Sequence, residues 1–450
     1  MDPYALCTDF AIASAFIFLG QLLRKYIPFF QKFFVPSSMI AGFLGLICGP
    51  YVFDLLPWSE ATGEYTWILI IIIFAIVGLQ GLEFDKEKFK KDASRIGSFV
   101  CYGQLLACIQ YSIPVLFGIF VLIPIFPNVE TPAFGFLVAA GFYGGHGTAA
   151  ALGSSFEKLG WENATDLAMT SATIGLMVAI FGGLLFIKWA TKKGHTKYIK
   201  NFTFLPKDLR TGFIEEDKRK PLGAETMSSL AVDSLGWHVT AVLIVTYIAY
   251  TIEEFFDYMI PGFIFAFIIG LIIFFIMRKT WIGRSWDEKT FDRISGTTTD
   301  YLVFFGIALV KIPVVIEYIV PFSILMGLGI LLVIIGLRFL GPAMNLNAWF
   351  ERSLFVFGYM SGVYATAFAL LRIVDSENKS KTLTDLPFQA LVQVEALALA
   401  LAPPMLMGTI GSALGYCGIF FGIGVGFFLL ALIFKWWYPK VPLKDRKAVE

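Results

Sequence analysis

Apolar segments alternate with short polar segments along the whole chain. Runs of roughly 20 apolar residues, long enough to cross a lipid bilayer, recur from one end to the other, for example at 5–23, 65–82, 164–189 and 320–338. Such runs cannot form the half-polar surface of a soluble domain. The pattern therefore predicts an all-α integral membrane protein.

The polar segments between these runs alternate between basic and non-basic, which indicates an orientation. "LRKYIPFFQKF" and "EFDKEKFKKDASR" are basic, whereas "DLLPWSEATGEY" between them contains no Lys or Arg. Lys and Arg collect in cytoplasmic loops, and the alternation continues to the basic end "KWWYPKVPLKDRK". We predict a multi-pass membrane protein with its N-terminus outside, its C-terminus in the cytoplasm and about eleven spans.

Composition narrows the function classes. The chain has 450 residues, of which 57% are hydrophobic, and a net charge of +1. Its mean hydropathy is +0.74. No basic surface indicates nucleic acid, and the five cysteines lack metal-ligand spacing, so they are interpreted as small core residues. Neither "HExxH" nor "GxSxG" nor a Walker-type loop occurs, and we predict no enzyme and no cofactor.

The two halves of the chain share three colinear sequence matches. "VPSSMIAGFLGLICG" from Val35 resembles "IPGFIFAFIIGLII" from Ile260, "FAIVGLQGLEF" from Phe74 resembles "FFGIALVKIPV" from Phe304, and "GFYGGHGTAAAL" from Gly141 resembles "GYMSGVYATAFALL" from Gly358. Many secondary transporters consist of two inverted-topology repeats. With about five spans per half, the second repeat enters the membrane in the opposite orientation. We predict an N-terminal repeat at 1–191, a cytoplasmic linker at 192–231, a C-terminal repeat at 232–411, and an extra C-terminal helix and tail at 412–450.

The third pair of matches predicts two re-entrant hairpins, near 135–153 and 353–372. They would enter from opposite faces and meet near the midplane of the membrane. Irregular backbone at that depth requires protein or a water-filled cavity around it. Half-helix N-termini at the tips offer N–H groups to a carboxylate, and freed carbonyls offer oxygen to sodium. The alternative is that the glycines only allow close helix packing.

The chain resembles the bacterial glutamate:sodium symporter (ESS) family at "GGHGTAAA", at "NATDLAMTSATIGLMVAIFGG" and at the N-terminal "LLRKYIPFFQKFFVPSSMIAGFLG". The resemblance implies sodium-coupled uptake of glutamate by a homodimer in the lipid of the bacterial inner membrane, with a transport domain moving against a scaffold in an elevator-type motion. It maps the first loop to Gly144, Gly145, His146, Gly147 and Thr148, and the following helix to Asn163, Thr165, Asp166, Thr170 and Thr173. In the second loop it maps to Gly358, Gly362, Ala365 and Thr366.

These residues give two overlapping candidate sites. For the substrate we predict Gly144, Gly145, His146, Gly147, Thr148, Ser361, Gly362, Thr366 and Glu395. For sodium, the coupling ion, we predict Thr148, Asn163, Asp166, Thr170, Thr173, Ser361 and Thr366. The leading hypothesis is sodium-coupled symport of glutamate or a related small carboxylate. A proton-coupled or exchanging carrier using Glu395 and His146 is an alternative, and an ion channel is an alternative of another class.

Four polar residues have open roles. Glu395 lies inside the apolar "FQALVQVEALALALAPP", where an ionisable group is costly and a functional candidate. It would contact an ion, a proton or a substrate ammonium group, or would pair with Gln389 or Gln393. Lys311 is interpreted as reaching the membrane surface, and Gln80 as either packing or supplying an amide. His146 would carry a proton or fix the loop tip.

Overall fold

The computed structural model describes residues 3–32, 35–59, 61–81, 86–199, 210–219, 221–256, 262–375, 378–390, 392 and 394–438. Within these residues every regular element is a helix. The N-terminal half contains α1 (Pro3–Tyr26), α2 (Pro28–Lys32), α3 (Ser37–Cys48), α4 (Thr62–Gln80), α5 (Lys86–Phe117), α6 (Ile123–Ile125), α7 (Ala133–Val138), α8 (Gly145–Lys158), α9 (Ala164–Met177) and α10 (Gly183–Lys193). The C-terminal half contains α12 (Ser234–Phe255), α13 (Gly262–Met277), α14 (Trp281–Arg284), α15 (Glu288–Ala308), α16 (Ile312–Glu317), α17 (Ile319–Ile335), α18 (Gly341–Met344), α19 (Trp349–Ser361), α20 (Tyr364–Val374), α21 (Thr382–Ala390), α22 (Val394–Leu406) and α23 (Ile410–Ile433).

Among the described residues, seven helical stretches are long and apolar enough to cross a membrane. They are Tyr4–Tyr26, Thr62–Gln80, Asp92–Ile125, Ala164–Lys193, Ser234–Phe255, Ile319–Met344 and Ile410–Ile433. Four shorter apolar helices occur at Ser37–Cys48, Ala133–Tyr143, Gly262–Met277 and Val394–Leu406. The four runs recognised in the sequence are helical, and the predicted extra C-terminal helix is α23. The all-α membrane class is thereby confirmed.

Three of these stretches continue through π-helical turns, in which each residue bonds to the fifth rather than the fourth before it. The turns are η1 (Gly118–Leu122) between α5 and α6, η3 (Val178–Gly182) between α9 and α10, and η5 (Gly336–Leu340) between α17 and α18. A further one, η2 (Ala139–Tyr143), follows α7. Such turns often mark functional positions in helices, and η2 ends directly before the glycines at 144 and 145.

Contacts divide the chain into two units. Unit 1 comprises Met1–Leu82, His146–Met169 and Pro206–Val315, and unit 2 comprises Glu83–Gly145, Thr170–Leu205 and Ile316–Glu450. The predicted division into two halves and a linker is a different one, since each unit here takes segments from both halves of the sequence. The boundary between Gly145 and His146 falls inside the glycine-rich motif.

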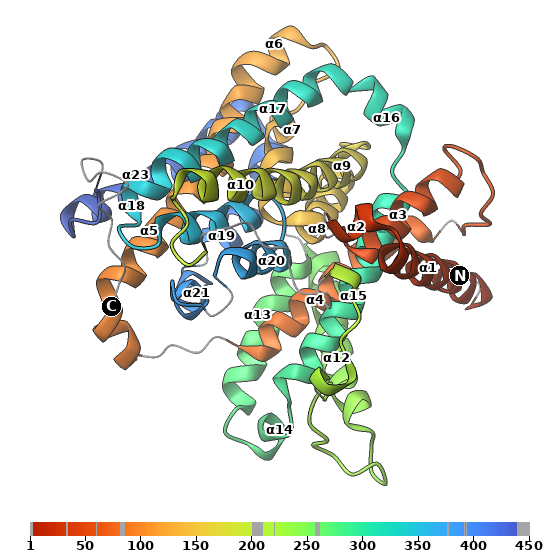
Figure 1. Ribbon diagram of the computed structural model, residues 1–450. Coiled ribbons are helices and arrows are strands. Elements are labelled where there is room, and N and C mark those ends of the chain that lie inside the picture. Colours follow the sequence, from red (N-terminus) through yellow and green to blue (C-terminus); the bar gives the residue numbers. More distant parts are fainter. Residues whose placement is uncertain are drawn as a thin grey trace. The chain divides into compact units, whose positions relative to one another are not determined.

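Unit 1 consists mainly of six packed helices. In Figure 1, α4 and α13 lie together, and the strongest pairings in this unit are α4 with α13, α1 with α3, α3 with α15, and α4 with α15. Helix α12 also packs on α13. Glycine makes the first of these contacts close, because a side chain at Gly78 would meet the Gly270 backbone at 2.9 Å. A side chain at Gly45 would likewise meet the Ala308 methyl group at 2.9 Å. Small residues that let backbones approach are the usual basis of membrane helix packing.

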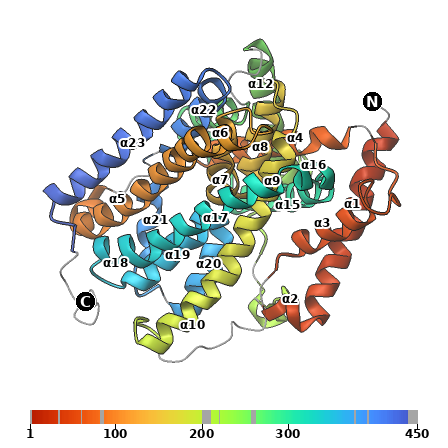
Figure 2. The same ribbon diagram turned by 90° about the horizontal axis from the view of Figure 1, so that it is seen from above.

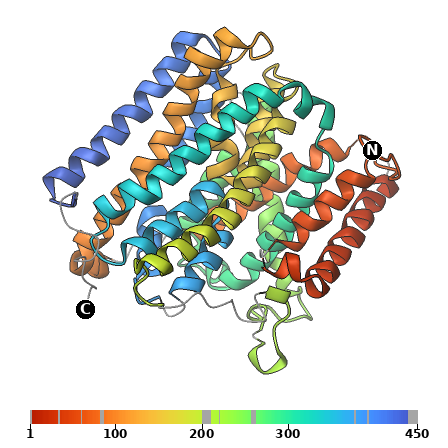
Figure 3. The same cartoon turned by 45° about the horizontal axis from the view of Figure 1, so that its top comes forward.

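Unit 2 is built around α5, whose neighbours come from both ends of the sequence. Helix α23 runs along α5 in Figures 2 and 3, and α7, α17 and α21 also contact it. The buried face is aromatic: Tyr111 of α5 packs edge-on against Phe420 of α23 at 5.4 Å between ring centroids. Phe136 and Tyr416 add a second such pair at 5.7 Å. Helices α19 and α20 pack against each other within the same unit.

Candidate functional site

Two helix breaks mark the positions where the sequence predicted re-entrant tips. The first break, Gly144–Gly145, lies between η2 and α8, and the second break, Gly362–Val363, lies between α19 and α20. Gly145 has φ +62°, in the left-handed region that only glycine adopts without cost. This explains locally why the chain places glycine there. The second break uses extended backbone instead, with Val363 at φ −132° and ψ 162° capping α20.

The carbonyl groups at the end of α19 are partly satisfied by side chains. A helix end leaves its last carbonyls without partners inside the helix. Gln110 Nε2 of α5 donates to one of them, the Met360 carbonyl, at 3.0 Å, and the Ser361 hydroxyl donates to the Phe357 carbonyl one turn earlier at 2.6 Å. Ser361 is fully buried, and Gln110 is 2% exposed. The second break is therefore held from the side by a buried amide.

The two breaks contact each other inside unit 2. A Cβ added at Gly145 would lie 2.4 Å from Val363 Cγ1 and 3.4 Å from the Gly362 carbonyl oxygen. The second break also touches the helix that follows the glycine motif, because a Cβ at Gly175 would lie 2.6 Å from the Ser361 carbonyl oxygen. Broken helices that meet in this way bring free backbone groups from two distant parts of the sequence to one place.

Glu395 faces the same region from α22. Its carboxylate accepts a hydrogen bond from the Tyr143 hydroxyl, at the end of η2. We call Tyr111, Tyr143, Tyr359 and Tyr364 the tyrosine cluster, since Tyr111–Tyr143, Tyr143–Tyr359 and Tyr359–Tyr364 are ring pairs at 5.7, 6.0 and 5.0 Å. The Glu395 carboxylate lies close enough to interact electrostatically with the hydroxyl groups of all four tyrosines. No ion pair to Glu395 occurs within the described residues.

A carboxylate among aromatic rings and without a cationic partner suits a ligand cation. An ammonium group would gain the charge of Glu395 and the faces of the tyrosine rings. The predicted structural pairing with Gln389 is not found, because Gln389 Nε2 donates to the Tyr359 hydroxyl instead. Gln393 lies outside the described residues.

The predicted site residues separate between the two units. Unit 2 contains Gly144, Gly145, Thr170, Thr173, Ser361, Gly362, Thr366 and Glu395, whereas unit 1 contains His146, Gly147, Thr148, Asn163 and Asp166. Within unit 2, the breaks and Glu395 gather around the tyrosine cluster, and Thr170 and Thr173 lie on α9 at its half-buried positions. Within unit 1, His146 and Thr148 are buried in α8, at 2% and 4% exposure.

Two polar residues have partners that the sequence did not indicate. Asp166 Oδ1 accepts the backbone N–H of Lys311 at 2.8 Å, and Lys311 Nζ lies 3.4 Å from Asp166 Oδ2. Lys311 therefore binds a carboxylate, whereas reaching the membrane surface was expected. Gln80 supplies its amide to Asp292 Oδ1 at 2.8 Å, at an exposed position of unit 1.

Sequence reasoning missed the amide and hydroxyl groups that surround the breaks. Gln104 and Gln110 were not recognised, although two glutamines in the apolar "CYGQLLACIQYSIP" are costly in a membrane helix. Both are buried, and the Oε1 atom of each has no hydrogen-bond partner in the structure. The tyrosines carried a signal too, because both glycine motifs contain them, as "GFYGG" and "GYMSGVY".

Apolar membrane helices interrupted at buried, contacting breaks are typical of secondary transporters. Comparison with known proteins agrees: the family model described as sodium/glutamate symporter matches residues 4–341. Since the match covers more than half of the chain, the protein belongs to the sodium/glutamate symporter family. This membership confirms the resemblance seen in the sequence and the prediction of a transporter rather than an enzyme.

A curated relative supports the same family at lower coverage. The chain is 27% identical over 184 residues to a protein named sodium/glutamate symporter from Haemophilus influenzae. The alignment covers 39% of this chain and 41% of the relative, so it spans less than half the length of that protein. No solved structure matches the chain significantly. The family match includes the first break and ends before the second break and Glu395.

Proposed function

We propose that the protein is a sodium-driven symporter of glutamate or a related small carboxylate. The observation that carries this proposal is the contact of the two breaks in unit 2, where Gly145 lies against Gly362 and Val363. Freed backbone groups of both breaks are available there for an anionic substrate and for sodium. Membership in the sodium/glutamate symporter family supports the choice of substrate and coupling ion.

In the proposed binding mode, Glu395 recognises the amino group of the substrate. Its carboxylate receives the ammonium, the tyrosine cluster surrounds it, and the first N–H groups of α20, before Thr366, receive a substrate carboxylate. Ser361, Thr366, Thr170 and Thr173 are the proposed oxygen donors for sodium. Thr148 and Asn163 remain predicted sodium residues of unit 1. Asp166 is assigned to Lys311, since both of its oxygens face that residue.

The pairing of helices in unit 1 supports two inverted repeats. The sequence matches pair α3 with α13 and α4 with α15, so a two-fold relation would convert the contact of α3 with α15 into that of α13 with α4. Both contacts are present. In the sequence matches, Gly78 corresponds to Ala308 and Gly270 corresponds to Gly45. The same two-fold relation would therefore convert the contact of Gly78 with Gly270 into the contact of Ala308 with Gly45, which is the second close glycine contact of this unit. A repeat relation therefore accounts for the packing down to single residues.

The two units have distinct proposed roles in transport. In the proposed repeats, unit 1 combines the equivalent helices α3 and α13 and the equivalent helices α4 and α15, and unit 2 contains the second broken helix pair. We propose that such units act as scaffold and transport domains of an elevator-type homodimer. The N-terminus would lie outside the cell and the C-terminus in the cytoplasm, with the glycine motifs as hairpins that enter from opposite sides.

Uptake by the purified protein in lipid vesicles tests the function. We expect glutamate accumulation driven by an inward sodium gradient at constant pH, and little accumulation driven by a proton gradient without sodium. The reverse result would support the proton-coupled alternative, for which Glu395 is the specific candidate. Saturable uptake that is stimulated by internal glutamate excludes a channel. Absence of sodium-driven glutamate uptake would contradict the proposal.

A further inference from the structure

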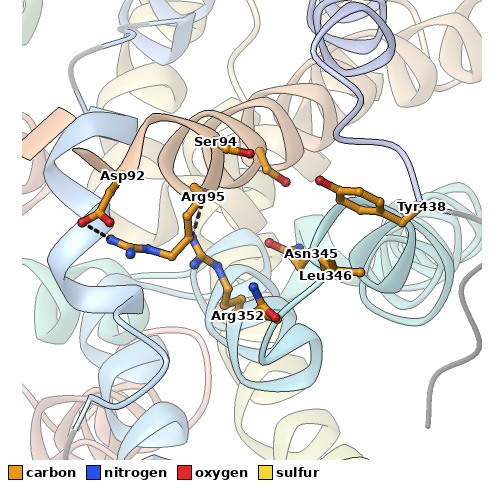
Figure 4. Close-up of a pocket in the computed structure, with 9 residues that line it drawn as sticks. Asp92, Ser94, Arg95, Asn345, Leu346, Arg352 and Tyr438 are labelled. Carbon is orange, nitrogen blue, oxygen red and sulfur yellow. Dashed lines mark hydrogen bonds and ion pairs between the residues drawn. The ribbon is translucent and has the colours of Figure 1, made fainter. Parts of the chain in front are cut away.

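Unit 2 contains a polar cavity at the start of α5, away from the two breaks. It has a volume of about 270 Å³. Figure 4 shows residues from three distant parts of the sequence around it, among them Asp92, Ser94, Arg95, Asn345, Arg352 and Tyr438. Asn347 lines the cavity as well. We call this cavity the arginine pocket. Arg352 lies nine residues before Ser361 in α19, about 13 Å along the helix axis at 1.5 Å per residue, so the pocket is distinct from the proposed transport site.

Two arginines at the pocket share one buried carboxylate. Asp385 accepts from Arg95 Nε and Nη2, at 2.8 Å each, and from Arg352 Nη2 at 2.9 Å. The side chains of Arg352 and Asp385 are 3% and 0% exposed. Asp92 pairs with Arg95 Nη2, at 2.9 Å. Arg352 therefore has no carboxylate of its own within the described residues.

One N–H donor of Arg352 has no hydrogen-bond partner. Its Nε atom is buried and makes no hydrogen bond in the structure. A guanidinium group has only donors, and an unsatisfied buried donor costs about 1–3 kcal/mol, more when it is charged. Arg352 lines the arginine pocket, so acceptor oxygens of a ligand there would meet a guanidinium group whose donors are not all hydrogen-bonded.

The segment after α23 closes one side of the pocket. Lys435 has φ +58°, and Trp436 N–H donates to the Ala431 carbonyl at 2.7 Å, so the chain turns back at the helix end. Trp436 Nε1 then donates to Ser94 Oγ at 3.0 Å, and Tyr438 N–H donates to the Ala343 carbonyl at 2.6 Å. A Cβ at Gly97 would lie 2.2 Å from the Trp436 ring, so only glycine leaves room for it.

We propose that the arginine pocket binds a phosphate-type anion, either free phosphate or the phosphate of a lipid headgroup. Arg352 supplies charged donors, and the amides of Asn345 and Asn347 and the hydroxyl of Tyr438 surround them. Arginine recognises phosphate oxygens through its planar set of N–H groups. The volume suits a headgroup-sized ligand rather than a larger cofactor.

Thermal unfolding of the purified full-length protein in detergent tests binding of the free anion. We expect inorganic phosphate to raise the Tm by a few degrees over chloride at equal ionic strength. The test variants are Tyr438→Phe and Asn347→Leu, which leave the Arg95–Asp385–Arg352 ion pairs in place, and both should lose the shift. Trp436→Ala removes the closing segment and should also lose it. Trp437→Ala is the matched control, because Trp437 packs on Phe428 at 5.1 Å rather than on α5.

A lipid arm separates the two sources of phosphate. The same proteins are melted in vesicles of phosphatidylcholine alone and of phosphatidylcholine with phosphatidic acid. A shift only with phosphatidic acid that the variants lose supports the lipid headgroup, and a shift with inorganic phosphate that they lose supports the free anion. No shift in either arm, or an equal shift in wild type and variants, overturns the proposal. Sodium-driven glutamate uptake should persist in Tyr438→Phe, so this outcome is independent of the transport assignment.

Discussion

The two helix breaks perform similar tasks with different chemistry. The first break relies on glycine, with Gly145 at φ +62°, and it lies inside the stretch that matches the symporter family. The second break has extended backbone at Val363, lies beyond that stretch, and is held by Gln110 from another helix. The first break therefore provides exposed backbone, and the second depends on side chains brought from elsewhere. We infer that the second break and Glu395 determine which substrate fits.

The largest effect is expected from Gly145→Ala. The substitution forces a side chain into left-handed backbone, at a cost of about 1–2 kcal/mol, and places its Cβ 2.4 Å from Val363 Cγ1. We expect sodium-driven glutamate uptake to fall by more than about tenfold while the protein still folds.

Gly160→Ala is the matched control for the first break. Gly160 also has positive φ, at +104°, but a Cβ there meets nothing within 4 Å. It should retain most uptake. The double variant Gly145→Ala with Val363→Ala removes the contacting methyl groups and should recover part of the activity. Equal loss in Gly145→Ala and Gly160→Ala would mean that backbone strain matters and contact between the breaks does not.

The second-largest effect is expected from Glu395, which faces the two breaks from α22. Glu395→Gln removes the carboxylate but keeps the shape of the side chain. Loss of a charge-assisted contact to the substrate ammonium costs about 1.5–3 kcal/mol, which corresponds to a rise of roughly 10–100-fold in KM for glutamate.

A substrate comparison separates binding from folding for Glu395. Glutarate has both carboxylates of glutamate and lacks the amino group. Wild type should prefer glutamate strongly in competition for uptake, and Glu395→Gln should lose this preference while glutarate inhibits both proteins alike. A preference that survives in Glu395→Gln would remove Glu395 from substrate recognition, whatever happens to the rate.

A smaller effect is expected from the amide that supports the second break. Gln110→Leu leaves the buried Met360 carbonyl without its partner, which costs about 1–3 kcal/mol of folding stability. Gln104→Leu is a close control, since Gln104 is also buried on α5 and donates to a backbone carbonyl, that of Gln389, at 3.3 Å. The two variants should lower the Tm similarly. Only Gln110→Leu should lower the uptake rate several-fold, and equal uptake in both variants would mean that the amide only stabilises the fold.

The features that sequence analysis found are those that depend on neighbours along the chain. Apolar runs gave the membrane helices, because a bilayer requires about 20 consecutive apolar residues. Glycines beside a histidine marked the first break, because left-handed backbone requires glycine locally. The match from Gly358 indicated the second break only through its likeness to the first.

The features that sequence analysis missed depend on contacts between distant residues. Gln110 and Met360 are 250 positions apart, and Asp166 and Lys311 are 145 positions apart. No local pattern specifies such pairs, since each residue alone fits several roles. Lys311 at a helix end is compatible with reaching the membrane surface, and only the fold places Asp166 beside it.

The smallest expected effect decides the role of Asp166. Lys311 is 46% exposed at its side chain, so solvent weakens the pair and its contribution should stay within about 1 kcal/mol. Asp166→Asn and Lys311→Gln should lower the Tm by similar small amounts, and the double variant should lower it no further, because both changes remove the same interaction. The sodium concentration for half-maximal uptake should be the same in all three variants. A higher sodium requirement in Asp166→Asn alone would return Asp166 to the predicted sodium residues.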